Sequence, residues 1–290
     1  MHKWTAYTCI LLAACSWGLV GTISRFAMSD GVTSIELCFW RMLFSTGLFL
    51  GHIFATNTWR LHSVKDAGYL ALFGIIGGAV FYYTFFWTTE HGSVALAVVL
   101  MYTCPVWVAV TARIIHKVAI TPRKILAIGS ALVGVVCMSL SSGGTVTITP
   151  KVIMVGLVTG ISFSSHFVFL KMLLKRYTPF AIYGYSLLVG TIALLPFVEI
   201  TSISYRNWMI IFGLAFFCTY LGYSIYSFGI KHVESTKASI IVNIEPVVAI
   251  FAAWFVWGEV FSALGWVGVA FVFAAVLVLV LGKQEEATDK

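Results

Sequence analysis

Two segments of the chain share a pattern that decides how the sequence folds. Residues His91–Pro105 read HGSVALAVVLMYTCP, and residues His232–Pro246 read HVESTKASIIVNIEP, with the histidine and the proline at the same places. The same register, in which the second copy follows the first by 141 positions, also aligns Tyr82 with Tyr223. Self-similarity at a fixed spacing indicates that the chain contains two related halves.

The composition places these halves in a membrane. Of the 290 residues, 60% are hydrophobic and 10% are charged, and the mean hydropathy is +0.97. Soluble domains carry roughly 25% charged residues, so lipid must be the solvent for most of this chain. The net charge of +7 does not indicate nucleic-acid binding, because the basic residues lie in short gaps between apolar runs. We expect a lipid bilayer and a small-molecule substrate as partners, and a monomer is compatible with this composition.

Ten apolar runs are long enough to cross a hydrocarbon core, which takes about 20 residues per helix. Five helices in each half is an odd number, so the second half must enter the membrane from the opposite side. We therefore expect an all-α integral membrane protein with ten transmembrane helices in two inverted five-helix repeats around a central cavity. The repeats would cover residues 1–144 and 145–282, followed by a cytoplasmic tail at 283–290. The predicted runs are 5–27, 34–56, 67–89, 93–113, 124–141, 152–171, 180–199, 208–230, 236–257 and 264–282.

The basic residues predict an orientation. If the N-terminus is cytoplasmic, 13 Lys and Arg residues fall on the inside, and Arg25, Lys151 and Arg206 fall on the outside. Cytoplasmic loops carry an excess of Lys and Arg, so both termini are predicted to lie in the cytoplasm and the protein in the inner membrane. Inverted duplication is typical of secondary transporters, which rock one half against the other to alternate access.

Several motifs resemble the EamA-like family of the drug/metabolite transporter superfamily. The segment Tyr226–Glu259 (YSFGIKHVESTKASIIVNIEPVVAIFAAWFVWGE) resembles the signature of that family's second half, with Glu-Pro-Val inside a helix and a closing Gly-Glu. Ser16-Trp17-Gly18 followed by Arg25 resembles its first-helix motif, and Arg41 stands where its second helix has an arginine. The resemblance covers essentially the whole chain. It implies ten helices, antiparallel repeats, a central cavity and transport of amino acids or similar small metabolites, often outward.

The two halves differ at several matched positions. Cys104-Pro105 stands where the second half has Glu245-Pro246, and Phe163 stands where a tryptophan would pair with Trp17. Lys117-Val118 in the first half matches Gly258-Glu259 in the second. We expect substrate choice to depend on such differences.

Four ionisable side chains fall inside the predicted helices: Glu36, Arg41, His166 and Glu245. A charge at a helix centre costs about 2.5–3.5 kcal/mol on the insertion scale, so each needs a partner or a water-filled site. Arg41 would either hold a substrate carboxylate or fix helix packing. Glu245, beside the helix-breaking Pro246, would either line a pathway and accept a proton or tie two helices together. His166 and Glu36 are further proton-coupling candidates, with a serine-bonded histidine and an interfacial acid as the alternatives.

Aromatic residues at mid-helix depth are the remaining candidates, and core packing is the alternative for each. Tyr and Trp combine apolar area with a polar group, and they can surround an ammonium group by cation–π attraction. Asn243 adds a neighbouring amide for an interhelical hydrogen bond or a ligand. The aromatic candidates are Trp17, Tyr82, Tyr83, Tyr102, Phe163, Tyr223 and Tyr226.

These features predict a secondary transporter of amino acids or related zwitterionic metabolites, acting as an exporter, with no cofactor and no metal. A carrier of cationic or quaternary ammonium compounds is one alternative. A nucleotide or sugar-phosphate exchanger is another, although only Arg41 is available at depth for phosphates. An integral-membrane enzyme would need a cluster of acids or histidines at one face, whereas the acids here are scattered. A non-transporting scaffold or receptor would not need two related halves, and no nucleotide-binding motif indicates an ATP-driven pump.

Overall fold

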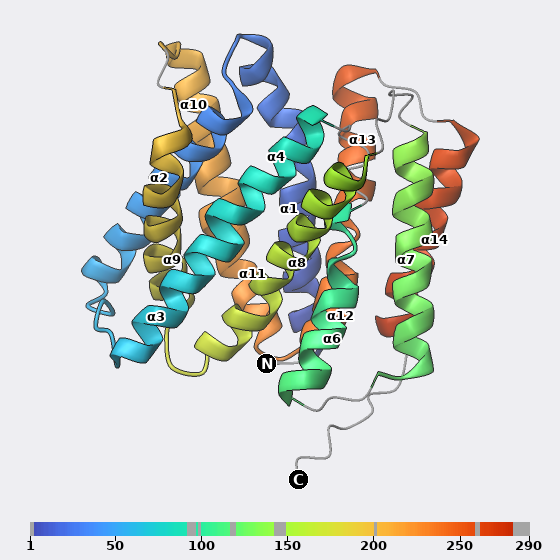
Figure 1. Cartoon of the computed structure of the whole chain (residues 1–290), viewed down its shortest axis with the longest axis horizontal. Coiled ribbons are helices and arrows are strands. Elements are labelled where there is room, and N and C mark those ends of the chain that lie inside the picture. Colours follow the sequence, from blue (N-terminus) through green and yellow to red (C-terminus); the bar gives the residue numbers. More distant parts are fainter. Residues whose placement is uncertain are drawn as a thin grey trace.

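The computed structural model of the chain describes residues 3–91, 97, 100–116, 120–141, 149–199, 202–258 and 262–280. These residues form helices joined by short connections, with no β-strand among them (Figure 1). The predicted tail at 283–290, Lys117-Val118 and Glu259 lie outside the described residues. The helices are α1 (Lys3–Ser29), α2 (Ser34–Ala55), α3 (Val64–Phe73), the π-helix η1 (Gly74–Val80), α4 (Phe81–His91), α6 (Cys104–His116), α7 (Pro122–Leu140), α8 (Pro150–Leu173), α9 (Pro179–Leu194), the 3-10 turn η2 (Leu195–Phe197), α10 (Tyr205–Gly213), the π-helix η3 (Leu214–Leu221), α11 (Gly222–Ile230), α12 (Ser235–Val242), α13 (Glu245–Trp257) and α14 (Ala263–Val280).

The predicted apolar runs coincide with these helices, because lipid forces every backbone polar group to be satisfied within its own segment. The stretches α3–η1–α4, α10–η3–α11 and α12–α13 each correspond to one predicted run. Seven helices of the described part of the chain are long and apolar enough to span a membrane. The predicted runs 93–113 and 264–282 extend into residues that are not described.

Hydroxyl side chains define where many helices begin. Ser63 accepts a hydrogen bond from the Asp66 amide at the start of α3, and Ser204 accepts one from the Asn207 amide at the start of α10. A side-chain oxygen at this position satisfies one of the amides left free in the first helical turn. Ser63 and Ser204 are 141 positions apart, so the register found in the sequence also relates two helix starts.

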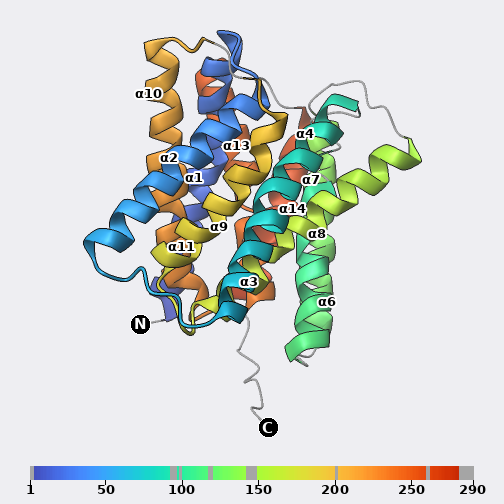
Figure 2. The same ribbon diagram turned by 60° about the vertical axis from the view of Figure 1, so that its left-hand side comes forward.

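Helices from the two halves of the sequence pack against one another in matching pairs. Helix α7 lies along α14, and α2 lies along α9 (Figures 1 and 2). Helix α1 packs on α11 and α13, while α8 packs on α4 and α6. If each helix is replaced by the helix at the corresponding place in the other half (α1 by α8, α11 by α4, α13 by α6), the same contacts are obtained.

Small residues allow the closest helix approaches. A Cβ atom at Gly18 of α1 would lie 2.6 Å from the Glu245 carbonyl oxygen of α13, and one at Gly134 of α7 would lie 2.7 Å from the Gly268 carbonyl of α14. Helices in lipid use such contacts because burial of apolar surface does not drive their association there. The contact at Gly18 brings α1 against the start of α13, where Glu245 lies.

Candidate functional site

The two π-helices each offer a backbone carbonyl to a side chain from the other half. The Gly77 carbonyl of η1 lies 2.9 Å from Nε2 of His166 on α8, and the Cys218 carbonyl of η3 accepts a 2.9 Å hydrogen bond from Nε1 of Trp17 on α1. A carbonyl oxygen can only accept, so His166 Nε2 carries a proton. Gly77 and Cys218 are 141 positions apart. π-Helical turns disturb the regular hydrogen-bond ladder and are frequent at functional sites.

A second pair of backbone irregularities, two breaks between helices, also follows the 141-position spacing. A turn at Asn243–Ile244 separates α12 from α13, and a turn at Tyr102–Thr103 precedes α6. The residue after each turn stands before a proline, which cannot donate a backbone hydrogen bond. The first residue of α13 is Glu245, and a carboxylate is stabilised at a helix N-terminus by the exposed amides and the helix dipole. This placement explains how an acid is accommodated in an apolar segment.

Glu245 has a partner on the opposite half of the sequence. Its carboxylate lies within hydrogen-bonding reach of the Tyr102 hydroxyl. Tyr102 is buried, whereas Glu245 keeps part of its surface open. The carboxylate is also close enough to Arg41 to interact with it electrostatically. No direct ion pair between Arg41 and Glu245 occurs in the described structure.

Arg41 is the buried cation of the site. Its Nε donates a 2.8 Å hydrogen bond to Thr219 Oγ1 of η3, and the hydroxyls of Tyr82 and Tyr223 lie near the guanidinium. The Tyr82 and Tyr223 hydroxyls are themselves within hydrogen-bonding reach of each other. Among the described residues, the two terminal nitrogens of Arg41 have no hydrogen-bond partner. Within the described structure, the two terminal nitrogens of this buried cation are therefore available to a ligand.

Aromatic rings connect these polar groups into one cluster. The Trp17 ring centroid is 5.3 Å from that of Tyr223 and 5.2 Å from that of Tyr226. The His166 ring lies 5.8 Å from both Phe163 and Tyr223. We call Trp17, Phe163, His166, Tyr223 and Tyr226 the aromatic cluster. Trp17 and Phe163 remain half-buried, and Tyr223, whose hydroxyl lies near the guanidinium, joins the cluster to Arg41.

Two of the sequence candidates, Tyr83 and Glu36, make their contacts away from this cluster. Tyr83 is 46% exposed, and its ring packs on Phe197 rather than on the cluster. Glu36 is fully buried and forms a capping box at the start of α2, where its carboxylate accepts hydrogen bonds from the Thr33 amide and hydroxyl. Asn243 is buried in the turn two residues before Glu245, and its side-chain Nδ2 has no hydrogen-bond partner among the described residues.

The sequence candidates omitted two residues of this site. Thr219 binds Arg41 as described, and the Tyr183 ring stacks on that of Tyr223 with centroids 4.5 Å apart. Both lie in the second half of the chain, and neither belongs to a recognisable motif. In the described residues, no three His, Cys, Asp or Glu side chains come together as metal ligands.

Comparison with known proteins identifies the family. The model of the EamA-like transporter family matches residues 4–140 and 150–281. The chain belongs to the EamA-like transporter family. It is 27% identical over 267 residues to an uncharacterized transporter of Archaeoglobus fulgidus, covering 90% of this chain and 92% of that protein. It is 25% identical over 288 residues to the uncharacterized inner membrane transporter YicL of Salmonella typhimurium, covering 96% of each.

A solved structure shares the fold of this EamA-like chain. The two superpose with a TM-score of 0.82 at 13% sequence identity, over 97% of this chain and 98% of the other, which is described only as "Crystal structure of protein". Together with the apolar helices, the family and these relatives make the chain a multi-pass membrane protein of a transporter family.

Proposed function

We propose that this EamA-like protein is a secondary transporter that exports amino acids or related small zwitterionic metabolites by alternating access. The observation that carries the proposal is the pairing of Arg41 and Glu245. Opposite charges lie near each other inside the helical bundle without forming a direct ion pair in the described structure, and aromatic rings lie beside them. A zwitterion with its carboxylate on Arg41 and its ammonium on Glu245 would complete both interactions.

Alternating access rests on the proposal that the ten helices form two inverted repeats, 1–144 and 145–282. The 141-position register recurs in helix starts, π-helical carbonyls and helix breaks. The family model also matches two ranges of similar length. In Figure 1 the beginning of α1 and the end of α8 lie at the same, lower side, as expected for equivalent helices of opposite direction. Rocking between two such halves opens a shared site to each side in turn.

The proposed location is the inner membrane with both termini in the cytoplasm. In Figure 1 the connection between α2 and α3, the end of α6, the start of α7 and the end of α8 lie on the side where α1 begins. Arg60, Arg113, Arg123 and Lys175 belong to or adjoin these segments, and such basic residues are typical of a cytoplasmic face.

Flux measurements in proteoliposomes test the proposal. Purified protein is reconstituted and assayed with each of the twenty amino acids, in both directions. Transport of at least one amino acid, abolished by Arg41→Gln, is the expected result. Absence of flux for every amino acid would exclude the proposed substrate class.

The aromatic cluster favours one alternative, a carrier of cationic or quaternary ammonium compounds. Trp17 packs edge-on with Tyr223 and tilted on Tyr226, and a ring face left open by this packing would attract an organic cation. Under this alternative, Trp17→Ala abolishes transport of tetraethylammonium, and Arg41→Gln leaves it intact. Under the leading proposal, Arg41→Gln is the more damaging change.

A further inference from the structure

The hydrogen bond between Arg41 and Thr219 restricts how the guanidinium can meet a ligand. A guanidinium binds a carboxylate either through its two terminal nitrogens or through Nε and one terminal nitrogen. Thr219 Oγ1 already accepts from Nε at 2.8 Å. Only the end formed by the two terminal nitrogens is left for a bidentate contact.

The Thr219 hydroxyl is oriented to accept the hydrogen bond from Arg41 Nε. It is 2% exposed, and it donates a long hydrogen bond of 3.5 Å to the Leu214 carbonyl five residues earlier in η3. Its proton is thereby directed into the π-helix, and its lone pairs face Arg41. Ser45, one turn along α2, donates to the carbonyls of Arg41 and Ala215. The turn of α2 that carries Arg41 is therefore held to η3 at two points.

Within the described residues, the positions that correspond to Thr219 and Arg41 in the other half do not repeat this arrangement. The position 141 residues before Thr219 is Gly78, which has no side chain; a Cβ atom there would lie 3.3 Å from Met42 and 3.4 Å from Gly190. Helices α2 and α9 start at the N-caps Thr33 and Thr178, which are 145 positions apart, so the residue of α9 that corresponds to Arg41 is the buried Ser186, which carries no charge. In the part of the chain that the structure describes, the Arg41–Thr219 pair therefore has no counterpart at the corresponding positions of the other half.

We propose that Thr219 is a positioning residue that sets the substrate's orientation, by fixing the Arg41 guanidinium for end-on binding of a single carboxylate. The inference rests on the proposed function and deepens it. A ligand has one carboxylate position, on the α2–η3 side, and its ammonium extends toward Glu245 and Tyr102. Selectivity for the carboxylate depends on Thr219 although Thr219 does not touch the substrate.

The test compares Thr219→Val, Thr219→Ser and Thr191→Val in proteoliposomes. Valine keeps the shape of threonine without its hydroxyl, and serine keeps the hydroxyl. Thr191 is a matched control, since it is 4% exposed and, among the described residues, its hydroxyl bonds only the Leu187 carbonyl of its own helix. The substrate is the amino acid with the highest wild-type uptake in the twenty-member panel, and its methyl ester, which lacks the carboxylate charge, is the competitor.

We expect Thr219→Val to raise the KM for the amino acid about tenfold or more, as loss of a charge-assisted hydrogen bond predicts. The inhibition constant of the methyl ester stays within about twofold, Thr219→Ser restores the wild-type KM, and Thr191→Val changes neither value. Equal effects of Thr219→Val on both ligands, or none on either, overturn the positioning role while the transport function stands. A wild-type protein that carries no amino acid overturns the proposed function and the carboxylate position together.

Discussion

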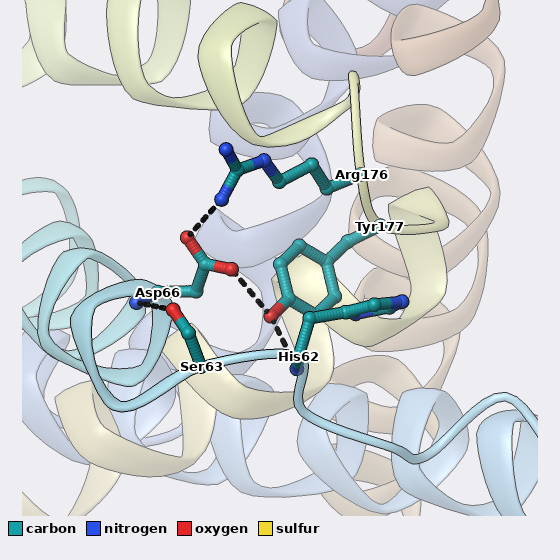
Figure 3. A network of polar contacts seen from close by, with 5 residues as sticks. All are labelled: His62, Ser63, Asp66, Arg176 and Tyr177. Carbon is teal, nitrogen blue, oxygen red and sulfur yellow. Dashed lines mark hydrogen bonds and ion pairs between the residues drawn. The ribbon is translucent and has the colours of Figure 1, made fainter.

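The Tyr177 hydroxyl donates a 2.9 Å hydrogen bond to the Asp66 carboxylate, joining the turn between α8 and α9 to the start of α3 (Figure 3). The same hydroxyl accepts a 2.8 Å hydrogen bond from the His62 amide, and Arg176 Nη1 lies 3.4 Å from the other Asp66 oxygen. On the second half, Arg206 at the start of α10 forms a 3.2 Å ion pair with Asp30 in the turn between α1 and α2. The two links join equivalent elements with their charges reversed.

Tyr177→Phe removes the hydroxyl that bonds both the Asp66 carboxylate and the His62 amide. The change takes a hydrogen bond from a carboxylate and leaves the His62 amide without its acceptor, so we expect a loss of about 2 kcal/mol in stability. Burial raises the pKa of Tyr177, so its hydroxyl keeps the proton that it donates to Asp66 at any pH near neutrality. Arg176→Gln changes stability by less than about 1 kcal/mol, because the arginine side chain is 67% exposed.

Thermal unfolding in detergent measures both changes. Tyr205→Phe is the control, because this tyrosine is 81% exposed. A Tyr177→Phe protein as stable as the control variant would contradict a structural role for the link.

The two links also report membrane topology. If the halves are inverted, Arg176 and Arg206 face opposite sides of the membrane, and both side chains are more than 60% exposed. In a variant without the six native cysteines, Arg176→Cys should react with a membrane-impermeant maleimide only from the cytoplasmic side, and Arg206→Cys only from the outside. Labelling of both positions from one side would exclude the inverted arrangement.

The helical runs were predictable because lipid imposes a length and an apolar composition on each helix. The two π-helices were not, since Gly74–Val80 and Leu214–Leu221 keep an ordinary apolar sequence and differ from an α-helix only in hydrogen-bond spacing. For the same reason the partners of Trp17 and His166, which are backbone carbonyls, could not be read from residue types. Glu36 looks like an intramembrane acid in the sequence, but its spacing from Thr33 is that of a capping box.

The ring N–H groups of Trp17 and His166, which donate to the π-helical carbonyls, should contribute measurably to the stability of the protein. Trp17→Phe keeps an aromatic ring but leaves the Cys218 carbonyl without its donor, and we expect a cost of about 1 kcal/mol in thermal unfolding. His166→Phe has a similar cost at Gly77, whereas His166→Gln retains an N–H donor and restores part of it. Trp254→Phe, at a 54% exposed site, is the control. Equal stability of Trp17→Phe and Trp254→Phe would show that the bond to Cys218 is energetically neutral.

Glu245→Gln tests the other end of the proposed substrate. Glutamine keeps the volume and a hydrogen-bond partner for Tyr102 but removes the negative charge, so an ammonium group loses its counter-ion while the turn before α13 is preserved. We expect the KM for the transported amino acid to rise about tenfold or more, since an ion pair in a low-dielectric site is weakly screened. The corresponding 2-hydroxy acid, which lacks the ammonium, should compete equally well with wild type and variant. Glu199→Gln, an exposed acid after α9, should leave both values unchanged. If the hydroxy acid and the amino acid lose affinity equally, Glu245 supports the fold of the site and does not recognise the ammonium.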